Sequence, residues 1–135
     1  NLILYLSKIK FMTRINCGIK PVELNQKHLL AEHREIKRLP NLISRGRYNM
    51  KSVPNEFTLG KGHVAFFYDK LEFVRKRYEE LYAECKARGY NVTYYGDAWN
   101  NIPKEFMNDY IPTKRDEEII RQRIKEKLEG TYKGK

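Results

Sequence analysis

Residues 63–88, HVAFFYDKLEFVRKRYEELYAECKAR, carry the strongest helical pattern of the sequence. Six apolar residues in it follow one another at steps of 4, 3, 4, 3 and 4, the spacing of a single helix face: Phe67, Leu71, Val74, Tyr78, Leu81 and Cys85. Gly89 comes soon after and suits the end of a helix. The stretch predicts one helix that opens at His63, as a packing residue or as a ligand. Its apolar stripe is expected in the core, with Cys85 as a core thiol and Phe66–Tyr68 as packing aromatics.

The rest of the chain predicts two further helices and a loop. Residues 21–38 combine a proline in the first turn with apolar residues at helical spacing, and Pro40 is expected to end that helix. Residues 114–129 repeat apolar side chains every four positions, whereas residues 40–62 are rich in Gly, Pro and basic residues. No alternation typical of paired strands is present. The sequence therefore predicts an all-α fold, a compact single domain of three principal helices with an ordered basic loop.

The composition indicates a folded protein that binds a polyanion. The 135 residues include 27 Lys and Arg against 17 Asp and Glu, a formal net charge of +10, and 41% of them are hydrophobic. This apolar content excludes a disordered polycation, and no apolar run reaches the length of a membrane span. Nucleic acid is the expected partner, with a membrane surface as the weaker alternative.

Metal chemistry is not favoured by the sequence. The three histidines and two cysteines are too scattered for zinc ligands, and neither cysteine has a CxxC partner, which suits a reducing, cytoplasmic setting. The acidic groups Glu79-Glu80-Glu84 and 116–118 lie in predicted helices, where we expect solvated faces. Because a two-metal nuclease needs converging carboxylates, that class is disfavoured and no metal is expected.

Positive charge is concentrated in the amino-terminal half. Between Met12 and Gly62 there are ten Lys and Arg residues and four Glu. On the predicted helix in this half, His28, Glu32 and Glu35 share one side. The charges of the basic loop and of the last helix are expected to hold phosphates: Arg45, Arg47, Lys51, Arg123 and Lys127.

The first eleven residues differ from those that follow. They are mostly apolar, and Met12-Thr13 opens a sequence of another character. We expect residues 1–11 to be an upstream extension, Met12 to be the biological start, and residues 12–135 to form the single functional domain.

A series of motifs after Met12 resembles a known family over almost the whole remaining length. These motifs are MTRIN (12–16), HL (28–29), AE (31–32), RE (34–35), Arg38, LG (59–60), GHV (62–64), FFYDKLEF (66–73), RKR (75–77), AEC (83–85), RG (88–89), IP (102–103), EF (105–106) and DYIP (109–112). They resemble the phage endonuclease V family of pyrimidine-dimer DNA glycosylases and AP lyases. A long, ordered match is more specific than any short motif.

The resemblance implies a compact all-α monomer, without metal or organic cofactor, that acts on cyclobutane pyrimidine dimers in duplex DNA. Such enzymes cleave the glycosidic bond of the dimer's 5′ pyrimidine through an imine and then break the strand by β-elimination. Their nucleophile is the α-amine of the threonine exposed when the starting methionine is removed, which corresponds to Thr13. Their catalytic carboxylate corresponds to Glu35.

The resemblance also implies contacts with damaged double-stranded DNA. Arg14, Arg34 and Arg38 match arginines at the scissile site, and Tyr132-Lys133 aligns with the family's aromatic tail. His28 is expected to bind DNA as well. The family kinks the duplex and flips out the base opposite the lesion, which costs least where pairing is already weak.

Two alternatives remain open at this point. If residues 1–11 are retained, the Thr13 nitrogen is an amide, and the chain becomes a non-catalytic damaged-DNA-binding protein on the same fold. A related glycosylase for another base lesion keeps the mechanism and changes the substrate. Each alternative places the protein on DNA in the cytoplasm of a bacterial or virus-infected cell.

Overall fold

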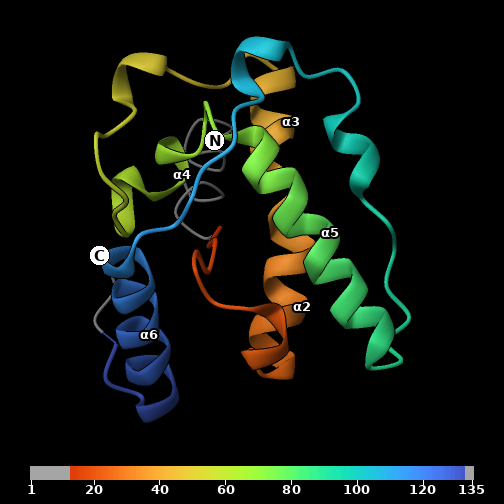
Figure 1. Cartoon of the computed structure of the whole chain (residues 1–135), viewed down its shortest axis with the longest axis vertical. Coiled ribbons are helices and arrows are strands. Elements are labelled where there is room, and N and C mark those ends of the chain that lie inside the picture. Colours follow the sequence, from red (N-terminus) through yellow and green to blue (C-terminus); the bar gives the residue numbers. More distant parts are fainter. Residues whose placement is uncertain (1–12, 133–135) are drawn as a thin grey trace, which may run out of the picture.

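The computed structural model describes residues 13–132, and within that range every regular element is helical. The α-helices of this part of the chain are α2 (Gln26–Glu35), α3 (Arg38–Ser44), α4 (His63–Phe66), α5 (Leu71–Ala87) and α6 (Lys114–Glu129). Helices α2 and α5 pack side by side, and α6 stands apart from them, with the N-terminal segment (residues 13–19) between (Figure 1). The expected all-α fold is confirmed, with α2, α5 and α6 as its long helices.

The helix predicted over 63–88 is two helices, so the prediction of a single one is wrong. The aromatic residues Phe66–Tyr68 are all buried. Successive residues of a helix point about 100° apart, so three in a row cannot share one buried stripe. The chain instead turns over residues 67–70, where the Lys70 N–H donates to the Phe67 carbonyl at 3.0 Å. This break brings all three rings into the core, which confirms them as packing aromatics.

The remaining stripe of that pattern forms the buried face of α5. Leu71, Val74, Leu81 and Cys85 are each 0% exposed. Burial also raises the pKa of the Cys85 thiol, and the expectation of a core thiol is confirmed by its complete burial.

The helix predicted over 21–38 is also divided. Its first residues, Pro21–Glu23, form a 3₁₀ turn. Helix α2 begins only after Asn25, whose side-chain oxygen accepts the His28 N–H at 2.8 Å. An asparagine cap satisfies one of the amides that a first helical turn leaves without a partner, and it fixes where α2 starts.

Pro40 lies inside α3 and does not end a helix, contrary to expectation. It occupies the first turn of α3, where a missing N–H removes no helical hydrogen bond. The basic loop therefore begins after Ser44 and not at Pro40.

Helix α6 forms over the predicted residues because both ends carry clear signals. The Thr113 hydroxyl accepts the Asp116 N–H at 3.1 Å, and the Asp116 carboxylate accepts the Thr113 N–H at 3.0 Å. Gly130, at φ 75°, supplies the left-handed conformation that closes the other end. Asp116 is 2% exposed and also accepts from the Tyr110 hydroxyl, so the expectation that it belongs to a solvated face is wrong.

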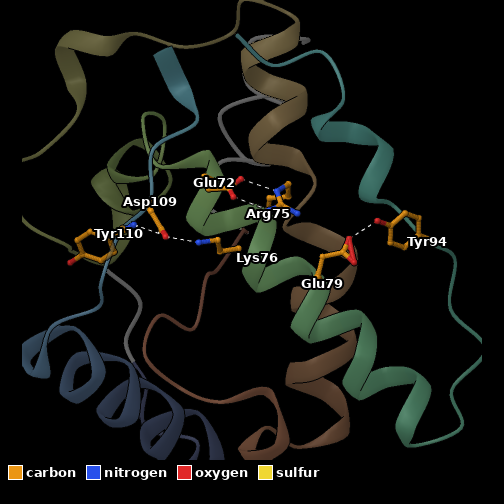
Figure 2. A network of polar contacts seen from close by, with 7 residues as sticks. All are labelled: Glu72, Arg75, Lys76, Glu79, Tyr94, Asp109 and Tyr110. Atoms are coloured by element: carbon orange, nitrogen blue, oxygen red, sulfur yellow. Dashed lines mark hydrogen bonds and ion pairs between the residues drawn. The ribbon is translucent and has the colours of Figure 1, made fainter. Parts of the chain in front are cut away.

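The exposed side of α5 carries polar contacts that tie it to the chain that follows (Figure 2). Lys76 pairs with Asp109 at 2.6 Å, and the Tyr94 hydroxyl donates to the Glu79 carboxylate. These contacts lie at the surface, where single ion pairs contribute little stability. The carboxylates on this face of α5 therefore make contacts at the surface, as expected of a solvated face.

Candidate active site

Three separate parts of the chain meet around a cavity of about 220 Å³. The N-terminal segment, α2 and α6 supply most of its lining. It brings together predicted site residues from all three: Arg14, His28, Glu35, Arg123 and Lys127. On α2 these side chains recur at helical spacing, which puts them on the face turned to the cavity.

Glu35, the last residue of α2, lines the cavity and pairs with two arginines that are not lining residues, Arg34 and Arg38. Its oxygens are 3.4 Å from Arg34 Nη2 and 3.7 Å from Arg38 Nη1, and its side chain is 13% exposed. Both separations exceed those of short charge-assisted hydrogen bonds. The carboxylate is therefore surrounded by positive charge while its oxygens can still accept a hydrogen bond or a proton from a bound molecule.

Positive charge inside the cavity exceeds what its carboxylates balance. Burial, and then the charges of Arg123, Lys27 and Lys127, hold the pKa of His28 below its ordinary value. Burial and the nearby charge of Arg14 likewise lower the pKa of the Arg123 guanidinium. Because like charges are crowded here, an anion such as a phosphate would relieve their repulsion on binding.

Thr13 is buried directly before Arg14 but is not itself a lining residue of the cavity. The Arg14 guanidinium turns back and donates to the Thr13 carbonyl at 3.0 Å. The expected nucleophile is therefore the direct chain neighbour of a residue that lines the cavity.

Residues that the sequence did not single out as site residues hold the N-terminal segment in place. Glu32 and Arg77 form a buried ion pair, and the Asn16 side chain donates to Glu32 at 2.6 Å. The sequence contains one signal for this pair. Arg77 stands three positions after Val74 in the apolar stripe, so a helical reading already places it at the buried side of α5.

The basic loop does not reach the cavity. Arg45, Arg47 and Lys51 are exposed and stand outside its lining. They remain predicted phosphate contacts outside the cavity.

The carboxyl-terminal tail approaches the cavity through Tyr132. Its ring lies 4.7 Å from Lys127 Nζ and 5.7 Å from the Arg123 guanidinium carbon, within the range of cation–π contacts. Tyr132 therefore helps to orient two cavity cations. Lys133, the other predicted tail contact, lies outside the described residues, as do residues 1–12.

Residues 13–132 lack two further features. No group of three or more His, Cys, Asp or Glu side chains in this range is arranged to hold a metal ion. In the same range, no helix is both long enough and apolar enough to cross a membrane.

A helical domain with a cation-lined cavity and a half-buried carboxylate at its edge fits the class of enzymes that act on a polyanion. The family model of the pyrimidine dimer DNA glycosylases matches residues 12–95, more than half of the chain, and the chain belongs to this family. The resemblance seen in the sequence is thereby confirmed, and the protein is a DNA repair glycosylase. The match begins at Met12 and includes Glu35, whereas α6 with Arg123 and Lys127 lies beyond it.

Proposed function

We propose that the protein excises cyclobutane pyrimidine dimers from duplex DNA through an imine and then cleaves the strand by β-elimination. The observation that carries the proposal is the cavity in which Glu35 meets Arg14, the neighbour of Thr13. Thr13 supplies the nucleophile as the first residue of a chain started at Met12 and freed of that methionine. Glu35 supplies the carboxylate.

An α-amine suits the first step. Its pKa near 8 leaves roughly a tenth of it neutral at pH 7, against a few in ten thousand for an ordinary lysine. The nitrogen lone pair of Thr13 bonds to C1′ of the sugar, and the bond from C1′ to the pyrimidine breaks with its electrons on the base. The departing base takes one proton from the amine nitrogen, and the sugar ring then opens, with a proton taken up by the ring oxygen, to give the cationic imine.

Glu35 suits the second step. Its carboxylate stabilises the cationic imine and removes the proton from C2′. The electrons released there break the bond from C3′ to the phosphate oxygen, and the strand is cut. Hydrolysis of the imine returns the free amine, so no outside oxidant or cofactor enters the balance.

The positively charged side chains bind the DNA phosphates. In this proposal the cavity cations, with Arg34 and Arg38 beside Glu35, hold the phosphates at the lesion, while Arg45, Arg47 and Lys51, outside the cavity, hold further phosphates. The cavity volume is several times the roughly 30 Å³ of one water. The cavity offers room for a base flipped out of the duplex, in keeping with extrusion of the base opposite the lesion.

The decisive experiment is nicking of ultraviolet-irradiated plasmid, in EDTA, by protein expressed from Met12. We expect nicks that increase with dose, none on unirradiated plasmid, and loss of nicking after the dimers are reversed enzymatically with light. Equal nicking of irradiated and unirradiated plasmid would point to a plain nuclease. Nicking that survives dimer reversal would assign another base lesion.

DNA binding is expected to strengthen as the pH falls through the range in which His28 takes up its proton. The pKa of free His28 is below its ordinary value, and a bound phosphate stabilises the imidazolium and raises that pKa. The complex then holds more protons than the free protein, so affinity increases with acidity between the two pKa values. Each unit by which bound DNA raises the His28 pKa increases the affinity at most about tenfold.

Fluorescence anisotropy with a duplex that carries an unreactive abasic analogue measures this dependence. His28→Asn is expected to remove part of it, and NMR titration of His28 with and without DNA gives the two pKa values directly. The same pH dependence in both proteins would rule out His28 as its source.

A further inference from the structure

His63 fixes the main chain of the N-terminal segment. It is 0% exposed, and its Nδ1 lies 2.9 Å from the Thr58 carbonyl, which can only accept a hydrogen bond. Nδ1 therefore carries the proton, and Nε2 is left to accept the Ile15 N–H at 2.8 Å. Burial lowers the pKa of His63 to about 3, which keeps it in this neutral form. The hydrogen bond holds the chain two residues after Thr13.

A second anchor holds the same segment through Asn16. The Asn16 amide donates to Glu32 Oε1 at 2.6 Å, and the Arg77 guanidinium donates to both oxygens of Glu32. Arg77 also donates to the Ile19 carbonyl at 2.8 Å, at the far end of the segment. Because Glu32 and Arg77 are buried and fully paired, this arrangement has little freedom to shift.

The anchor and the proposed catalytic carboxylate belong to one rigid element. Glu32 and Glu35 are three residues apart on α2, and both line the cavity. A segment fixed to Glu32 is therefore also fixed with respect to Glu35, one helical turn away. His63 adds a second fixed point from α4.

We propose that this buried network positions the Thr13 amine against Glu35. Its members are positioning residues, which act through the N-terminal segment and not on the reacting atoms: Asn16, Glu32, Arg77 and His63. The inference rests on the proposed function, since it assigns a purpose to the segment that carries the nucleophile. Reaction rates fall steeply when a nucleophile is displaced by as little as about 1 Å.

Two variants test the two anchors separately, each in protein expressed from Met12. Asn16→Ala removes the side chain that reaches Glu32 and leaves the Glu32–Arg77 pair intact. His63→Phe keeps a ring of similar size but has no acceptor for the Ile15 N–H. Asn108→Ala is the matched control, because it removes two hydrogen bonds, to the Asp69 and Glu105 carbonyls, that involve no residue of the cavity.

The readout separates chemistry from binding and from folding. Single-turnover borohydride trapping on an abasic-site duplex, at saturating protein and well below every melting midpoint, is expected to slow by about 10- to 100-fold in both variants. Affinity for the unreactive abasic analogue is expected to stay within about twofold, and the control is expected to match the wild type in both assays. Amide exchange at Ile15 is expected to accelerate in His63→Phe.

The failures are distinguishable. If wild-type protein traps and Asn16→Ala traps at the same rate, the positioning inference is overturned and the proposed function stands. Slow trapping that follows weaker binding in proportion would make Asn16 a DNA contact instead and would also overturn the inference. If folded wild-type protein with a verified Thr13 terminus does not trap at all, the proposed function fails and the inference fails with it.

Discussion

Protein that begins at Thr13 is expected to be trapped on damaged DNA by borohydride, whereas protein that keeps residues 1–12 is expected to give no adduct. The difference in trapping depends on the chemical form of the Thr13 nitrogen. As the α-amine it has a lone pair that is available at neutral pH, but as an amide its lone pair is delocalised into the carbonyl group. An amide cannot form the imine, so trapping should fall to background while the cations that hold DNA remain in place.

The measurement pairs mass spectrometry of each preparation with trapping on an abasic-site duplex. A protein with one alanine added before Thr13 is a close control, because it offers a free α-amine that is displaced by one residue. We expect it to trap far more slowly than the protein that begins at Thr13. If the extended chain, with its mass verified, traps at full rate, the nucleophile is another amine. Lys27, which lines the cavity, would be the first to test.

Helix α6 is a case in which local sequence signals predict the bounds of a helix correctly. Thr113 caps its start, Gly130 closes its end, and the apolar spacing between them agrees with both signals. All these signals lie within one short stretch and agree with one another. The predicted and observed bounds agree for that reason.

The first two predicted helices show the opposite case. Whether a helix continues through Phe66–Tyr68 depends on what the core can accept, and Pro40 lies in the first turn of a helix only because α3 begins at Arg38. Both helix boundaries depend on tertiary packing. Spacing on one helix cannot express them, because it reports which residues share a face and not what meets that face.

The cavity residues show the same contrast between what the sequence predicts and what only the tertiary structure reveals. The spacing of His28, Glu32 and Glu35 predicts their common face on α2, which the structure confirms for all three as lining residues. It gives no sign that Arg123 of α6 completes the wall. Nor does it separate Glu32, which Arg77 neutralises in the interior, from Glu35, which stays at the cavity edge. Two glutamates on one face are alike in sequence and differ only in what surrounds them.

Glu35→Gln is expected to bind damaged duplex at least as well as the wild type and to cut it about 10²- to 10⁴-fold more slowly, the usual effect of losing a general base. The amide has the shape of the carboxylate but accepts no proton from C2′ and does not stabilise a cationic imine. Removing one negative charge from beside Arg34 and Arg38 leaves those arginines more available to phosphate. Binding and cutting should therefore change in opposite directions.

Glu118→Gln provides the matched control, because it removes the same charge from an exposed position on α6 outside the cavity lining. Its binding and cutting are expected to stay close to those of the wild type. Glu35→Asp tests geometry, since it keeps the charge and draws the carboxylate back by one methylene, and an intermediate rate is expected. Single-turnover cleavage of dimer-containing duplex, measured beside anisotropy, gives both quantities. Full cleavage by Glu35→Gln would remove the carboxylate from the mechanism and leave the ion pairs with Arg34 and Arg38 as its whole role.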